Sequence, residues 1–302
     1  MKTILIGSVS SSKTILEEMI RIKFPIDMVF SLDEACAGNV SGYCPIHEIA
    51  ELHSIPYRKF KAINNVEHIA VIREINPDYI FIIGLSQLVG KEIIKEASKG
   101  VVGFHPTPLP KFRGRAAMVW QILLGVRETK CSMFFIDEGI DSGDIIMQEE
   151  YVIEDVDYAV DVSRKMNEAF RRLVMKVLPQ MKAGTFQSVK QNEEEATYLL
   201  RRTPEDGIIN WQEPMEKIQR LIRAVSKPYP GAFSNYDGKH KAIFWKADYL
   251  KNDKYIGIPG QIAKITNDYI DIVCLDGLLR VYEYENIDKV NLIVGHQFKS
   301  GC

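Results

Sequence analysis

Five apolar residues stand in a row in the first third of the chain, Tyr79-Ile80-Phe81-Ile82-Ile83. No polar residue alternates with them, and the helix-stopping sequence Asn76-Pro77-Asp78 comes directly before them. Such a run is typical of a strand that is buried on both faces of a parallel sheet. We therefore expect this strand to lie inside an open α/β sheet.

Strand-like and helical patterns alternate on both sides of this run. Lys2–Ile6 is β-branched, a Ser-rich turn and a helical pattern follow it, and Ile26–Phe30 is again strand-like. This alternation continues to about residue 180 and predicts an open, mostly parallel sheet covered by helices. Ligands of such sheets bind at the carboxyl ends of the strands, so the loops after Ile6, Ile83 and Val102 are the candidate binding loops.

The second half of the chain has a different pattern. Met181–Glu195 is polar, as interdomain linkers are. A helix is expected at Met215–Val225, and the step Asp276-Gly277 is typical of a tight hairpin turn. The sequence predicts a catalytic domain at 1–185, then a linker and a smaller β-rich domain at 186–302. Its strands are expected at Ala242–Trp245, Gly260–Ile265, Ile270–Cys274 and Leu278–Tyr282.

Composition limits the class of protein. The 302 residues are 46% hydrophobic and 26% charged, which is ordinary for a globular protein of two domains. No apolar run approaches the ~20 residues that cross a bilayer, and Met1–Gly7 lacks the features of an export signal. We therefore expect a cytoplasmic protein without a membrane partner.

Cysteines and net charge exclude further classes. The five cysteines are scattered, with no C-x-x-C pair that would indicate a metal or redox site, so no metal is predicted. The formal net charge of −2 disfavours a nucleic-acid partner, because such proteins normally carry a basic surplus. The sequence leaves open whether the chain forms a homodimer.

Two motifs about thirty residues apart identify a family. The first is His-Pro-x-x-Leu-Pro-x-x-Arg-Gly at His105–Gly114, and the second is Asp-x-Gly-x-Asp-x-Gly-Asp at Asp137–Asp144. Together they resemble the folate-dependent formyltransferases, which include methionyl-tRNA formyltransferase and the sugar N-formyltransferases. The resemblance continues through Arg202–Trp211 and Lys227–Ala232 and covers about residues 1 to 285.

This resemblance implies a fold and an activity. The fold would be a Rossmann-like N-terminal domain with an OB-like C-terminal domain. The co-substrate would be N10-formyltetrahydrofolate, whose formyl group is transferred to an amine without a metal. Folate would bind between two loops, and the residues expected to contact it are Ser86, Gln87, Leu88, Val89, Asp137, Glu138, Gly139 and Ile140. For Leu88 and Val89, packing in the core at a strand end is the alternative.

Formyl transfer to an amine requires acid–base chemistry. The reaction passes through a tetrahedral intermediate, so one group must accept a proton from nitrogen and another must stabilise the oxyanion. Imidazole titrates near neutral pH, and His105 is the expected base, with Asp141 orienting it. A histidine in a turn and an aspartate that caps a loop are the structural alternatives. Asp137 and Asp144 fit the capping role better than Asp141 does.

One residue departs from the family pattern. Family members usually carry an asparagine two residues before the histidine, whose side chain can bind the oxyanion, but Gly103 stands there. Loss of such a donor can cost ~3 kcal/mol of transition-state stabilisation. Gln87, a backbone amide, an ordered water or protonated His105 would have to donate instead. A non-catalytic folate-binding paralogue is the alternative.

The acceptor is inferred from the loop after the second strand. In the tRNA-specific branch this loop is long and basic, whereas Ser31–Tyr43 contains no lysine or arginine. Asn39–Tyr43 looks more like the sugar N-formyltransferases. We therefore expect an amino-sugar acceptor, either nucleotide-linked or a nonulosonic acid of the pseudaminic type, used in surface-polysaccharide biosynthesis; methionyl-tRNA is the alternative.

Two cations in the first motif are candidates for binding this acceptor. Lys111 and Arg113 would contact a phosphate or carboxylate, since a guanidinium fits both anions. Solvated loop charges are the alternative interpretation for both side chains. No pattern in the sequence names the sugar, the nucleotide or the nitrogen that is formylated.

Overall fold

The computed structural model describes residues 1–85, 87–251 and 254–300. The chain forms two compact units, which we call the first and the second unit. The first comprises Met1–Ala117, Glu128–Val152 and Arg164–Leu199, and the second comprises Met118–Arg127, Ile153–Ser163 and Leu200–Cys302. Two short segments that precede Leu200, Met118–Arg127 and Ile153–Ser163, therefore belong to the second unit, and the first unit continues to Leu199.

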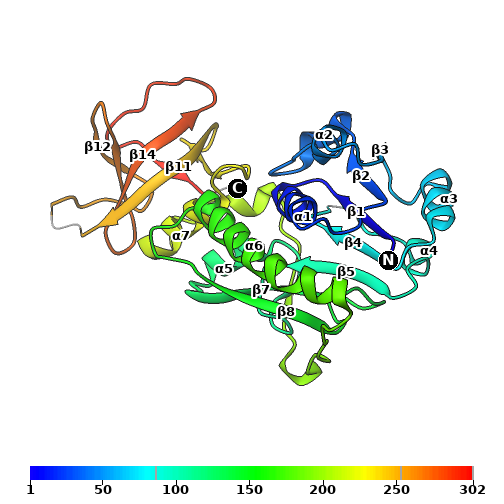
Figure 1. The fold of residues 1–302 in the computed structure, drawn as a ribbon. Coiled ribbons are helices and arrows are strands. Elements are labelled where there is room, and N and C mark those ends of the chain that lie inside the picture. Colours follow the sequence, from blue (N-terminus) through cyan, green and yellow to red (C-terminus); the bar gives the residue numbers. More distant parts are fainter. Residues whose placement is uncertain (86, 252–253, 301–302) are drawn as a thin grey trace. The chain divides into compact units, whose positions relative to one another are not determined.

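A seven-stranded sheet forms the centre of the first unit, with the strand order β3-β2-β1-β4-β5-β7-β8 (Figure 1). The first five strands in this order are parallel, while β7 pairs antiparallel with both β5 and β8. The strands are β1 (Thr3–Gly7), β2 (Met28–Leu32), β3 (Tyr57–Phe60), β4 (Tyr79–Ile83), β5 (Gly100–His105), β7 (Glu128–Phe135) and β8 (Ile145–Val152).

Helices cover both faces of this sheet. Strand residues alternate between the faces, so Ile4 and Ile6 share one buried cluster with Ile72 of α3 and Ile93 of α4. On the other face Phe104 packs on Phe170 of α6, with ring centroids 4.0 Å apart. The helices of the first unit are α1 (Ser10–Arg21), α2 (Ile46–Leu52), α3 (Val66–Ile75), α4 (Lys91–Ile94) and, from Arg164 onward, α6 (Ala159–Ala183), with the 3-10 helix η1 at Glu34–Asn39. The helix α5 (Ala117–Leu123) belongs to the second unit from Met118 onward.

The polar segment after α6 returns to the first unit. Residues 198–199 form the short strand β9 (Tyr198–Leu199), which pairs in parallel with β6 (Arg113–Gly114). A 3-10 helix, η2 (Glu193–Glu195), precedes β9. Gln191 and Glu193, inside the stretch whose composition predicted a linker, bind Arg113 of the first motif.

The second unit contains a six-stranded antiparallel sheet with the order β12-β13-β14-β11-β10-β15. The predicted hairpin is present, because Val273 of β13 pairs with Leu278 of β14 across the Asp-Gly turn. Its elements are η3 (Pro204–Gly207), α7 (Met215–Val225), β10 (Ala232–Tyr236), β11 (His240–Leu250), β12 (Ile262–Ile265), β13 (Ile270–Val273), β14 (Leu278–Asn286) and β15 (Phe298–Lys299).

The predicted fold class, a mostly parallel α/β sheet followed by a smaller β-rich domain, is confirmed. Tyr79–Ile83 forms β4 and Met215–Val225 forms α7, with the expected bounds. The antiparallel edge made by β7 and β8 is not encoded in any local pattern, because it depends on a pairing between distant residues. No helix among the described residues is long and apolar enough to cross a membrane.

Candidate active site

His105 is the last residue of β5, at the carboxyl edge of the parallel part of the sheet. Its side chain is 8% exposed. The Nε2 atom lies 2.8 Å from the carbonyl oxygen of Phe112. A carbonyl only accepts hydrogen bonds, so Nε2 is the donor and the neutral ring has its lone pair on Nδ1.

Asp141 lies in the loop between β7 and β8, and its carboxylate reaches His105. Its Oδ2 atom is 3.6 Å from His105 Nδ1, and the same oxygen accepts a hydrogen bond of 2.8 Å from the Gly114 backbone N–H. The residue has a φ of +50°, in the left-handed region that non-glycine residues rarely adopt. The two residues predicted to cooperate are therefore brought together from positions 36 apart in the sequence.

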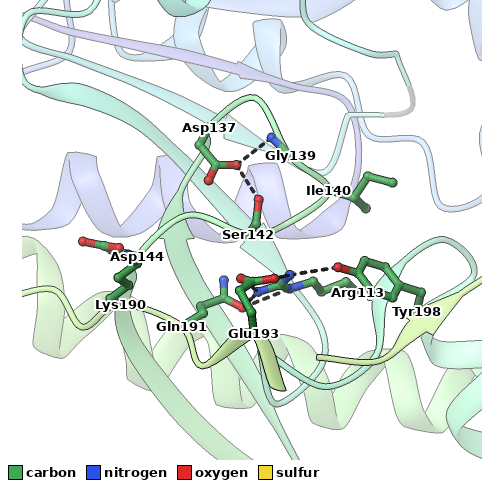
Figure 2. Close-up of a pocket in the computed structure, with 10 residues that line it drawn as sticks. All are labelled: Arg113, Asp137, Gly139, Ile140, Ser142, Asp144, Lys190, Gln191, Glu193 and Tyr198. Carbon is green, nitrogen blue, oxygen red and sulfur yellow. Dashed lines mark hydrogen bonds and ion pairs between the residues drawn. The ribbon is translucent and has the colours of Figure 1, made fainter. Parts of the chain in front are cut away.

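The start of the second motif forms a turn that Asp137 caps. Asp137 Oδ1 accepts hydrogen bonds from the Gly139 backbone N–H at 3.0 Å and from Ser142 Oγ at 2.7 Å (Figure 2). This is the local role that the sequence favoured for this aspartate. Glu138 forms an exposed ion pair with Lys91 at 3.1 Å, and Ile140 is 61% exposed.

The loop after β4 is held by side-chain contacts within the chain. Gln87 accepts a hydrogen bond from Ile63 N at 3.0 Å and donates one to Lys61 O at 2.6 Å. Both ends of this amide therefore have protein partners, which does not favour Gln87 as the donor to an oxyanion. Leu88 is 78% exposed, so core packing does not account for it, while Val89 packs against the buried cluster of the sheet. Ser86, also predicted to bind folate, lies outside the described residues.

Arg113 is buried, with only 1% of its surface exposed. Its Nε and Nη2 atoms donate to Gln191 Oε1 at 3.1 and 2.8 Å, and Nη1 and Nη2 donate to the two carboxylate oxygens of Glu193 at 2.9 and 2.7 Å. Nη1 also donates to the Tyr198 hydroxyl at 3.1 Å. All five N–H groups of the guanidinium therefore bind chain partners, which argues against direct binding of an acceptor anion. Lys111, the other predicted cation, is exposed.

The Arg113–Glu193 ion pair changes the electrostatics of this region. Hydrogen bonds from the guanidinium hold the pKa of the Glu193 carboxyl below its usual value of 4.5. Glu193 therefore stays ionised at neutral pH, and the pair persists under physiological conditions.

One pocket of about 430 Å³ lies beside the second motif (Figure 2). It contains three of the residues predicted to bind folate, but neither His105 nor the described residues of the loop after β4. The lining residues are Arg113, Asp137, Gly139, Ile140, Ser142, Asp144, Lys190, Gln191, Glu193 and Tyr198. Among the residues that the structure describes, no group of three His, Cys, Asp or Glu side chains is arranged to hold a metal.

Comparison with known families agrees with the two motifs. The sequence model described as formyl transferase matches residues 24–178, and the one described as formyl transferase, C-terminal domain, matches residues 201–298. The chain belongs to the formyl transferase family. Family membership and the two-unit fold confirm the resemblance drawn from the motifs at His105–Gly114 and Asp137–Asp144.

Several solved structures of this family share the fold. The sugar 3N-formyl transferase WlaRD, solved in the presence of dTDP and 5-N-formyl-THF, is 19% identical, with 96% of this chain and 99% of that chain covered and a TM-score of 0.69. The N-formyltransferase from Helicobacter canadensis, in complex with folinic acid and dTDP-3-aminofucose, is 20% identical, with 94% and 100% covered and a TM-score of 0.69. Methionyl-tRNA formyltransferase from Clostridium thermocellum is 24% identical, with 92% and 100% covered and a TM-score of 0.61.

The space around Gly103 in this formyl transferase explains why no asparagine stands there. A Cβ atom added to Gly103 would lie 2.8 Å from Ile136 Cγ1 and 3.0 Å from two ring carbons of Phe134. The first of these distances is shorter than real Cβ contacts, and the others are tighter than most of them. The space in which an asparagine side chain would begin is therefore filled by apolar side chains.

The sequence did not identify Gln191 as a residue of this site. Gln191 is 5% exposed, and its Nε2 atom donates to the carbonyl oxygens of Asp141 and Gly143, both at 2.7 Å. It lies in a polar stretch whose composition is that of a solvated segment. No local signal distinguishes a glutamine that folds back into the protein from one that faces water.

Proposed function

We propose that this formyl transferase transfers the formyl group of N10-formyltetrahydrofolate to the amine of an amino sugar carried on a nucleotide. The amine nitrogen forms a bond to the formyl carbon, and the bond between that carbon and N10 then breaks. One proton leaves the attacking nitrogen and one is taken up by N10, so tetrahydrofolate is the leaving group. In this proposal His105 handles the proton and Asp141 positions the imidazole.

The observation that carries this proposal is the meeting of His105 and Asp141 at the carboxyl edge of the sheet. With Nε2 bound to the Phe112 carbonyl, Nδ1 is the nitrogen that can accept a proton. A proton accepted there produces an imidazolium that faces the Asp141 carboxylate at 3.6 Å. The carboxylate thus faces the positive charge that develops on the ring when His105 acts as general base.

Folate as the co-substrate is supported by relatives of the same fold. WlaRD was solved with 5-N-formyl-THF, and the enzyme from Helicobacter canadensis was solved with folinic acid. In this chain β4 is the parallel neighbour of β5, so the loop after Ile83 begins at the sheet edge where His105 lies, and the loop 137–140 leads directly to Asp141, whose carboxylate is 3.6 Å from His105 Nδ1. Because folate has a planar ring with polar edges, backbone groups of these loops are suitable partners for it.

An amino-sugar acceptor is supported by the loop after β2. This loop contains η1 (Glu34–Asn39), and the Asp33 side chain caps it by accepting a hydrogen bond from Ala35 N at 2.9 Å. The segment carries acidic residues and no lysine or arginine, which is unsuitable for binding the phosphates of tRNA. The two sugar-modifying relatives were solved with dTDP and with dTDP-3-aminofucose.

The test is an assay of the purified full chain with N10-formyltetrahydrofolate and a panel of amines. The panel contains dTDP- and UDP-linked amino sugars, free amino sugars, a pseudaminic-type acid and charged initiator tRNA. Release of tetrahydrofolate and a mass increase of one formyl group on the acceptor are both measured. Turnover with a nucleotide-linked amino sugar is the expected result, while turnover with none of these amines would reject the proposal.

The tRNA branch gives a different result in the same assay. The logarithm of the affinity for a polyanion falls linearly with the logarithm of the salt concentration, because counterions are released when phosphates are neutralised. Formylation of charged tRNA that falls steeply between low and physiological salt would replace the amino-sugar acceptor with tRNA. Folate binding without turnover of any amine would favour the non-catalytic alternative that Gly103 raises.

A further inference from the structure

We propose that Gln191 is a positioning residue for the candidate active site: it fixes the backbone on both sides of Ser142 and thereby holds the Asp141 carboxylate against His105. The proposal rests on the proposed function for its kinetic consequence, but its geometric part can be tested without any substrate.

The first support is the pair of hydrogen bonds from the Gln191 amide. Both bonds are 2.7 Å long, and they bind the carbonyl oxygens of Asp141 and Gly143. Asp141 has a φ of +50°, in the left-handed region, which aspartate tolerates better than most non-glycine residues but which still gains from contacts that hold it. The two N–H groups of the Gln191 amide are suitable for holding this turn, because they satisfy the backbone carbonyls of Asp141 and Gly143.

The second support is Arg113, which fixes the orientation of the Gln191 amide. Gln191 Oε1 accepts from Nε and Nη2 of Arg113, at 3.1 and 2.8 Å. If the amide were rotated by half a turn, its NH₂ group would face the guanidinium and its oxygen would face two carbonyls. Both contacts would be repulsive, so Arg113 selects the one orientation in which Nε2 points at the Asp141 loop.

The third support is that Arg113 also controls the side chain of Asp141. The residue after it, Gly114, donates its backbone N–H to Asp141 Oδ2 at 2.8 Å. Arg113 itself is held by Glu193 and Tyr198, and the strand that contains it pairs with β9. The segment 191–199 therefore holds Asp141 in two ways, through its main chain by Gln191 and through its carboxylate by Gly114.

Burial makes this arrangement rigid. Gln191 is 5% exposed and Arg113 is 1% exposed, so water does not compete for their hydrogen bonds. Figure 2 shows Gln191 and Glu193 converging on Arg113, below the turn that carries Ser142. Because the imidazole and the carboxylate are 3.6 Å apart, a small shift of the turn changes their interaction directly.

The decisive variant is Gln191→Glu. The carboxylate still accepts from Arg113, but it has no hydrogen to donate and it repels the two carbonyls of the Asp141 loop. We expect kcat to fall by about 10-fold to 100-fold, the usual effect of losing a residue that orients a functional side chain through hydrogen bonds. The KM for folate should change little. Gln187→Glu, an exposed glutamine on the same segment, is the matched control and should keep wild-type kinetics.

A second measurement separates positioning from mere stability. The ¹⁵N signals of the His105 ring report the surroundings of both ring nitrogens, and His105→Ala identifies them among the six histidines. We expect these signals to shift in Gln191→Glu and to stay in place in Gln187→Glu, while circular dichroism shows that both variants are folded. If Gln191→Glu does not fold, Gln191→Met, of similar length, replaces it in the same measurements.

The outcomes are distinguishable. Folded Gln191 variants with unchanged His105 signals would overturn the positioning role. Unchanged kcat in a wild type that is active would overturn it as well. A wild-type chain that formylates no amine rejects the proposed function, and the His105 signals then decide the role of Gln191 alone.

Discussion

Ile136 fills the space into which a side chain at position 103 would project, because a Cβ built on Gly103 would lie 2.8 Å from Ile136 Cγ1. The asparagine amide that the motif led us to expect at this position is therefore not only missing, but its space is filled by packed apolar atoms. An oxyanion donor must come from another group, and the described contacts of Gln87 do not favour that residue. Both ring nitrogens of His105 face chain partners, Phe112 O and the Asp141 carboxylate, so a backbone amide or an ordered water is the donor that this arrangement leaves.

Gly103→Asn should destabilise the protein rather than restore an active-site donor. Inserting a side chain against Ile136 and Phe134 overpacks the site, which typically costs ~1–3 kcal/mol. Thermal or urea unfolding measures this loss, and Gly38→Asn is the control, since no atom lies within 4 Å of a Cβ at Gly38. A variant that is as stable as the wild type and faster would show that the space opens readily.

His105→Ala and Asp141→Asn should remove turnover without removing folate. Loss of a general base typically lowers a rate by about two to four orders of magnitude. Folate binding, followed by fluorescence quenching or calorimetry, should remain because neither side chain is expected to hold the pterin. The exposed His53→Ala is the control. Normal rates in either variant would exclude that residue from the mechanism.

Gly114→Ala should damage both the fold and the activity. Gly114 has a φ of +107°, and an added Cβ would lie 2.4 Å from the carbonyl oxygen of Leu199. To relieve this clash, β6 or β9 must move. The Gly114 N–H then moves away from the Asp141 carboxylate that it binds. Gly184→Ala separates the backbone cost from the clash, since Gly184 has a φ of +70° with no atom within 4 Å. Equal melting temperatures for the two variants would contradict this expectation.

Glu193→Gln should show a pH-dependent stability difference. The folded-state pKa of Glu193 is depressed below 4.5 by Arg113, so its stabilising effect is fully present above that pH and is lost as pH falls through the lower folded-state value. The difference in melting temperature between wild type and variant should therefore be constant from pH 8 to about pH 5 and shrink below it. If the difference in melting temperature disappeared near neutral pH, a group other than Glu193 would be responsible for it.

Thiol reactivity should follow burial. Burial raises the pKa of the Cys131 thiol to about 12 and that of Cys274 to about 12, so both remain protonated and inaccessible. Cys36 and Cys44 are only partly buried. Among these four cysteines, peptide mapping after alkylation at pH 8 should find label on Cys36 first, more slowly on Cys44, whose pKa burial also raises, and not on Cys131 or Cys274. Labelling of Cys131 at the rate of Cys36 would show that the sheet opens locally.

Local sequence patterns predicted much of the fold, because they act within a few residues. An uninterrupted apolar run indicates either a buried strand or a buried helix segment. Tyr79–Ile83 is only five residues long and follows the helix stop Asn76-Pro77-Asp78, which indicates a strand, and this segment is β4. Helical periodicity likewise predicted α7. The two motifs indicated His105 and Asp141, although their meeting at 3.6 Å required the antiparallel return of β7.

The sequence by itself indicated the alternation of strands and helices, the carboxyl edge as the candidate site and the two residues expected to act there. Only the tertiary structure decided which polar side chains face inward. Arg113 appeared as a candidate for acceptor binding and Gln191 as part of a solvated segment, yet they bind each other from positions 78 apart. A side chain's polarity is a local property, but its burial depends on the partners that distant parts of the chain bring to it, and those partners are chosen by packing.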